Sequence, residues 1–84
     1  SSPIGVVAIL HNIGYIQYRS SELENALATF NDALHLSRLC HSKVDIAASL
    51  NCMGVICFHM PKAETSRAME YYSEALDIRR QCFG

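Results

Sequence analysis

The strongest constraint on the fold of this chain is that one pattern of residues occurs twice. The string LHNIG at residues 10–14 returns as LNCMG at residues 50–54, and ALATFNDAL at residues 26–34 returns as AMEYYSEAL at residues 68–76. A long, fixed period with apolar residues at matching places is the mark of a repeat protein. The first pair is offset by 40 residues and the second by 42, which predicts a two-residue insertion between Phe58 and Arg67. We therefore expect one domain, residues 1–84, with repeat one at about 3–41 and repeat two at about 42–83.

The composition limits the classes of partner. Of the 84 residues, 50% are hydrophobic and 18% are charged, which suits a packed chain rather than a disordered one. The formal net charge is -1, so the chain lacks the excess of Lys and Arg that attracts nucleic acid or anionic membranes. The apolar run from Ile4 to Leu10 is far shorter than the roughly 20 residues that span a bilayer, and we interpret it as the buried stripe of a first helix. We expect neither a nucleic acid nor a membrane as a partner.

Start and stop signals predict four helices, at residues 3–19, 22–40, 43–59 and from Pro61 or Thr65 to 82. Ser2 and Pro3 are typical of a helix start, because serine accepts bonds from free N–H groups and proline is tolerated at the first helical position. Two further pairs have the spacing of a capping box, and they are Ser21 with Glu24 and, more weakly, Ser42 with Asp45. The third helix ends at Met60, because Pro61 cannot continue the hydrogen-bond ladder.

Apolar residues that recur at three and four positions predict the buried face of each helix. The predicted positions are Ile9, Leu10, Ile13, Ile16 and Tyr18 in the first helix, Leu23, Ala26, Leu27, Phe30, Ala33 and Leu34 in the second, Ile46, Ala47, Leu50, Met53, Gly54 and Cys57 in the third, and Ala68, Tyr72, Ala75, Leu76 and Ile78 in the fourth. Gly14 interrupts the first helix, where glycine costs about 1 kcal/mol relative to alanine. Its retention predicts that the second helix passes close by.

The repeated residues resemble the tetratricopeptide repeat, whose pattern has an aromatic and Leu-Gly in helix A, then Ala, an aromatic and Ala in helix B. The residues that carry the resemblance are Leu10, Ile13, Gly14, Ala26, Phe30 and Ala33, and their counterparts Leu50, Met53, Gly54, Ala68, Tyr72 and Ala75. The chain departs from the pattern with Leu in place of Trp, Gln17 and Cys57 in place of Tyr, and Arg38 and Arg80 in place of Pro. The longer period and the string ALDIRR at residues 75–80 are similar to the kinesin-light-chain type of repeat.

The resemblance implies an all-α fold of two tandem helix-turn-helix hairpins, whose four antiparallel helices form part of a right-handed superhelix. It also implies that the helix A residues line a concave groove that binds a peptide or a partner protein. The residues carried over to that groove are His11, Asn12, Tyr15, Tyr18, Arg19, Asn51, Val55, Phe58 and His59, with Ala8 and Ala48 beside them. A carboxamide such as that of Asn51 both donates and accepts hydrogen bonds, which suits an extended peptide backbone. Tyr18 and Phe58 have an alternative role, which is to seal the helical hairpin.

Catalysis and metal binding find little support in the sequence. There is no Gly-rich phosphate loop and no Ser/His/Asp arrangement, so we expect a protein that is not an enzyme and has no cofactor. Cys52 and Cys57 are five residues apart, about 140° around a helix, unlike the tight C-x2-C spacing of zinc ligands. We therefore expect no metal site. Helical repeats that read RNA would have a basic groove, which the net charge contradicts.

Two further expectations concern the setting and assembly of the chain. Cysteines without a recognisable secretory signal predict reduced thiols and a cytoplasmic location. Helical hairpins bury their apolar faces by stacking, and arrays of this kind generally need three or more units. The alternative function is therefore an assembly unit, in which exposed faces of the terminal repeats associate to form a homodimer.

Overall fold

The computed structural model describes residues 2–60 and 65–83, and these residues form four helices and no strand. The helices are α1 (Pro3–Arg19), α2 (Leu23–Leu39), α3 (Lys43–His59) and α4 (Thr65–Phe83). The predicted all-α class is confirmed, and the bounds predicted for the first three helices agree within one residue. Thr65 is one of the two predicted starts of the fourth helix, whereas Pro61 lies outside the described residues.

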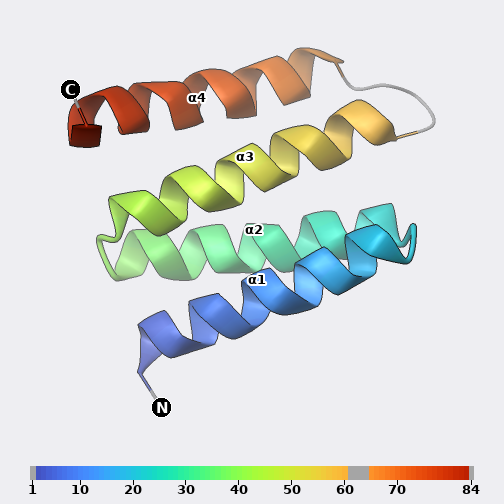
Figure 1. Ribbon diagram of the computed structural model, residues 1–84, viewed down its shortest axis with the longest axis horizontal. Coiled ribbons are helices and arrows are strands. Elements are labelled where there is room, and N and C mark those ends of the chain that lie inside the picture. The colour runs from blue at the N-terminus through green and yellow to red at the C-terminus, as the bar shows by residue number, and fades with distance from the viewer. Residues whose placement is uncertain (1, 61–64, 84) are drawn as a thin grey trace.

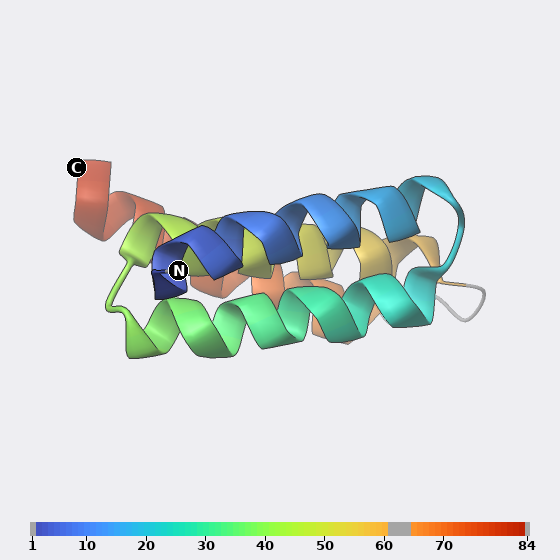
Figure 2. The ribbon, with the colours of Figure 1, turned by 90° about the horizontal axis from the view of Figure 1, so that it is seen from below.

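The helices form a slab of 33 × 31 × 16 Å in which each helix packs against the next in the chain. They lie side by side in chain order and alternate in direction, with α1 and α4 at opposite edges (Figure 1). Seen along the slab, α1 and α3 lie on one side, while α2 and most of α4 lie on the other (Figure 2). In agreement with this, α1 also touches α3 directly.

The predicted caps are confirmed at the start of α1 and wrong at the start of α2. The Ser2 hydroxyl accepts a hydrogen bond from the Gly5 amide at 3.1 Å, with Pro3 as the first helical residue. Ser21, by contrast, has a φ of 63°, and α2 begins without a side-chain cap. The amide of Ser21 donates to the Tyr18 carbonyl and that of Glu22 to the Gln17 carbonyl. This is a Schellman motif, so Ser21 ends α1 instead of starting α2.

The turn between α2 and α3 has the same construction. His41 has a φ of 55°, and the amides of His41 and Ser42 donate to the carbonyls of Arg38 and Ser37. The Ser42 hydroxyl donates to the Asp45 carboxylate at 2.6 Å and caps no backbone amide of α3. The predicted pairing of Ser42 with Asp45 is therefore present, but it joins two side chains.

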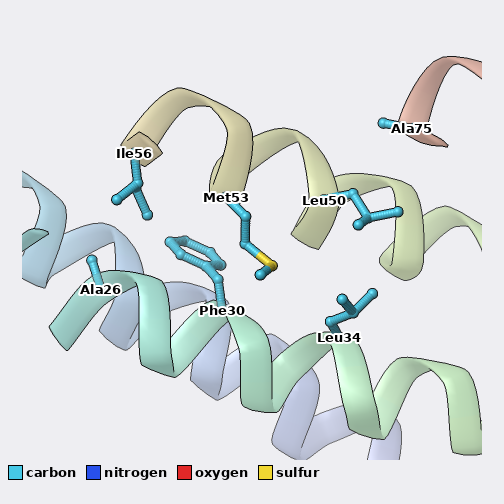
Figure 3. Packing of buried hydrophobic residues seen from close by; sticks show 7 residues of the cluster. All are labelled: Ala26, Phe30, Leu34, Leu50, Met53, Ile56 and Ala75. Atoms are coloured by element: carbon cyan, nitrogen blue, oxygen red, sulfur yellow. The ribbon is translucent and has the colours of Figure 1, made fainter. Parts of the chain in front are cut away.

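The core lies mainly between α2 and α3, with one contribution from α4 (Figure 3). Its buried members are Ala26, Phe30, Leu34, Leu50, Met53, Ile56 and Ala75. Burial is wrongly predicted for Ile9, Ile13 and Ile16, which are 42 to 63% exposed, and for Leu76, which is 49% exposed. The reason is that α1 and α4 lie at the edges of the slab, where none of the other described helices covers their outer faces.

The prediction that α2 passes close to Gly14 is confirmed. A Cβ atom on Gly14 would lie 2.7 Å from the ring of Phe30, closer than side chains pack. The counterpart in repeat two makes the counterpart contact, since a Cβ atom on Gly54 would lie 2.9 Å from the ring of Tyr72. Each glycine thus admits the aromatic side chain of the following helix, at equivalent places in the two repeats.

Candidate functional site

An apolar hollow of about 170 Å³ opens between α1 and α3. It is lined by Tyr15, Tyr18, Phe30, Cys52, Val55 and Ile56. Phe30 and Ile56 are buried and face one another across the α2–α3 contact (Figure 3), so they form its floor. Tyr15 is 55% exposed and stands at the rim. The hollow therefore offers an apolar surface of the size of one large side chain.

The exposed rim is held in place by a contact within α1. Arg19 Nη1 donates a hydrogen bond of 3.0 Å to the Tyr15 hydroxyl, and its guanidinium carbon lies 5.8 Å from the centre of the Tyr15 ring. The two residues are four apart, so a helix places them on one face. Arg19 thus orients Tyr15 and brings a positive charge to the edge of the hollow.

A second, more open hollow of about 360 Å³ lies at the C-terminal ends of α1 and α3. It is lined by Tyr18, Arg19, Ser21, Leu23 and His59. The rings of Tyr18 and His59 lie 6.1 Å apart, so they link the ends of the two helices. Tyr18 borders both hollows, and we call the two hollows together the α1–α3 groove.

His11 has a different position from the other candidate residues. Its Nε2 atom lies 2.7 Å from the Ser49 hydroxyl of α3, and its ring centre lies 5.8 Å from that of Phe30. Burial lowers the pKa of His11 below its ordinary value, and the charge of Asp45 opposes this shift. His11 is thus part of the packing that joins α1 to α3, where its polar atom already has a partner.

The remaining candidates lie outside the hollows. Asn12 is exposed on α1, and Asn51 is half-buried on α3. Phe58 is 58% exposed and contacts the neighbouring His59 ring edge-on at 5.7 Å. The structure therefore brings Tyr15, Tyr18, Arg19, Val55 and His59 together in the α1–α3 groove.

Sequence reasoning missed five residues of the groove, namely Phe30, Cys52 and Ile56 of the first hollow and Ser21 and Leu23 of the second. Cys52 lies three residues before Val55, so the helical spacing alone places both on neighbouring parts of α3. Phe30 was predicted only as a core residue, because its second role depends on the space that α1 and α3 leave above it. Burial raises the pKa of the Cys52 thiol above its ordinary value.

Within residues 2–60 and 65–83, no three His, Cys, Asp or Glu side chains come together as a metal site would require. In the same part of the chain, no helix combines the length and apolar character needed to cross a membrane.

Comparisons with protein-family models, curated proteins and solved structures find no match to this chain. Its function must therefore be inferred from its own residues and their arrangement.

Proposed function

We propose that this chain is a non-catalytic protein-interaction module of the tetratricopeptide-like class, built from two tandem helical hairpins that form part of a right-handed superhelix. The support is the repeated packing contact, in which Gly14 admits Phe30 and Gly54 admits Tyr72. Equivalent residues of two sequence repeats thus make equivalent contacts. The direct contact of α1 with α3 also agrees with a stack of helical pairs.

The proposed ligand is an extended peptide segment of a partner protein, bound in the α1–α3 groove. The observation that carries this proposal is the apolar hollow between the helices, lined by Tyr15, Tyr18 and Val55. Binding sites on proteins combine such an apolar pocket with a few polar groups at its edge. Here Arg19 and His59 border the adjoining hollow, so a large apolar side chain of the ligand would enter the first hollow and polar atoms would lie near the second.

The amide side chains add a second element to the proposal. No hydrogen bond joins the side chain of Asn12 or Asn51 to any residue that the structure describes, although Asn51 is half-buried. A free carboxamide can bond both the N–H and the C=O group of an extended backbone. We assign backbone recognition to Asn51 and recognition of an apolar side chain to the hollow.

Selection from a random peptide library, followed by calorimetry on the enriched peptides, tests this proposal. We expect the enriched peptides to share a large apolar residue. They should bind the Val55→Arg variant at least about tenfold more weakly, because the longer, charged arginine side chain would occupy the apolar hollow. Ala28→Arg is the matched control, since it places the same charge on an exposed position of α2. Peptides that bind both variants equally well, or a library without enrichment, would refute the groove as the binding surface.

A further inference from the structure

The outer face of α1 exposes three isoleucines at helical spacing. Ile9, Ile13 and Ile16 are 56, 42 and 63% exposed. They lie at positions i, i+4 and i+7, so they form one stripe along the helix. We call this stripe the α1 face. Contiguous exposed apolar residues of this kind mark interaction surfaces on proteins.

The chain itself shows what covers such a stripe. The repeat counterparts of the three isoleucines, 40 residues further on, are Ser49, Met53 and Ile56 of α3. All three are at most 2% exposed, and Met53 and Ile56 pack in the core against Phe30 and Leu34 of α2 (Figure 3). Within the chain, the stripe of α3 that corresponds to the α1 face is therefore covered by the preceding helix pair, α1 and α2.

The outer face of α4 carries the matching half of that contact. Leu27 and Leu34 pack in the core between α2 and α3, and their counterparts, 42 residues further on, are Met69 and Leu76. Met69 is 63% exposed and Leu76 is 49% exposed, whereas Leu34 is 4% exposed. We call Met69 and Leu76 the α4 face. Met69 and Leu76 are thus apolar like Leu27 and Leu34, with which α2 covers α3.

Charges at the edge of the contact also match. Arg38 of α2 and Glu74 of α4 form an ion pair of 2.9 Å between the two repeats. The counterpart of Arg38 is Arg80, and the counterpart of Glu74 is Asp32. Arg80 and Asp32 are both exposed, and neither forms an ion pair with a residue that the structure describes. An α4 face placed on an α1 face would therefore set Arg80 opposite Asp32, with opposite charges.

We propose that the α4 face of one copy docks on the α1 face of a second copy, in the same way that α2 packs on α3 within the chain. The contact buries Met69 and Leu76 against Ile9, Ile13 and Ile16, and Arg80 of one copy pairs with Asp32 of the other. Because the two faces differ, the contact is head to tail and a further copy can add at each end. The bond between His11 and Ser49 has no counterpart in this contact, since the equivalent positions hold Asn51 and Ile9.

Sedimentation velocity over a wide range of concentrations tests the apolar part of the contact. The 84-residue chain should associate with rising concentration, while Ile13→Asp and Leu76→Asp, each at an exposed position, should remain monomeric with an unchanged helical circular dichroism spectrum. A chain that is monomeric throughout the range would overturn the proposal. Association that both substitutions leave unchanged would overturn it as well, because another surface would then be responsible.

Charge reversal tests the register of the contact. Arg80→Glu and Asp32→Arg should each weaken association about three- to tenfold, because each sets like charges opposite one another. An equimolar mixture of the two variants should recover the association of the unaltered chain, because the carboxylate introduced in one variant then meets the guanidinium introduced in the other. Failure of the mixture to recover would refute the proposed register.

Asp77→Arg is the matched control for Asp32→Arg. Asp77 is exposed on α4, and its counterpart His35 stays exposed although α2 is packed between neighbours. The internal contact therefore does not use this position, and the substitution should leave association unchanged. An effect as large as that of Asp32→Arg would mean that net charge, rather than a specific pair, controls association, which contradicts the proposal.

Discussion

At the scale of single residues, Phe30 connects the packing of the helices to the proposed binding surface. Its ring closes over Gly14, lies 5.8 Å from the ring centre of His11, and forms part of the floor of the α1–α3 groove. The same ring thus contacts Gly14, His11 and the groove. We therefore expect a substitution at one of these three contacts to alter the packing at the other two. Gly14 and His11 are the neighbours at which this coupling can be measured.

Gly14→Ala should lower the free energy of unfolding by about 1 kcal/mol. The added Cβ atom would lie 2.7 Å from the buried Phe30 ring, and overpacking of this kind costs about 1–3 kcal/mol, which exceeds the gain of about 1 kcal/mol in helix propensity. Urea unfolding measures the difference. Gly54→Ala should cost less, because its neighbour Tyr72 is only half-buried and can move. A Gly14→Ala chain that is more stable than the original would show that the Phe30 ring moves aside freely.

Acidification should destabilise the chain through His11. Burial lowers the pKa of His11 in the folded chain, so the unfolded chain binds the proton more tightly. The free energy of unfolding should therefore fall as the pH falls through about 6.5, and this loss should level off below the folded pKa. Urea midpoints measured on both sides of that pH show the effect. The stability of the His11→Gln variant should depend less on pH, because this variant lacks the group whose pKa changes on folding. Equal pH dependence in the two chains would exclude His11 as the cause.

At the scale of elements, the two described turns are nearly copies of one another. Ser21 and His41 both take the left-handed conformation that closes a Schellman motif, at φ of 63° and 55°. The sequence predicted helix bounds within one residue there, because the loss of apolar spacing is a local signal. Sequence reasoning assigned Ser21 to the wrong helix, because serine is common both at helix N-caps and in turns.

Ser21→Gly should raise the free energy of unfolding by about 0.5–1 kcal/mol. Left-handed backbone costs a residue with a Cβ atom roughly 1–2 kcal/mol, and glycine avoids most of this cost while losing more chain entropy on folding. Urea unfolding again provides the measurement. Ser20→Gly is the neighbouring control, since Ser20 has a φ of -87° and gains nothing from glycine. If both substitutions destabilise the chain equally, the left-handed turn stores no strain.

At the scale of the whole molecule, the slab has two surfaces with separate proposed roles. The α1–α3 groove lies between α1 and α3, whereas the α1 and α4 faces belong to the two helices at the opposite edges of the slab, whose positions Figure 1 shows. Docking of a second copy would place its α1 next to α3 of the first, so the grooves of successive copies would adjoin. A ligand longer than one groove would then bind two copies more tightly than one.

The sequence by itself determined the four helices, the bounds of the first three and the close approach of α2 at Gly14, because helical spacing and the duplicated pattern can be recognised in the sequence alone. It also predicted Tyr15, Tyr18 and Val55 as members of one surface, through the resemblance of its repeats. Only the tertiary structure decided that Ile13 faces water while its counterpart Met53 is buried, since this depends on whether another helix lies beyond. In the same way, His11 is joined to Ser49 because the crossing of α1 and α3 places two distant residues in contact, which no spacing along the chain records.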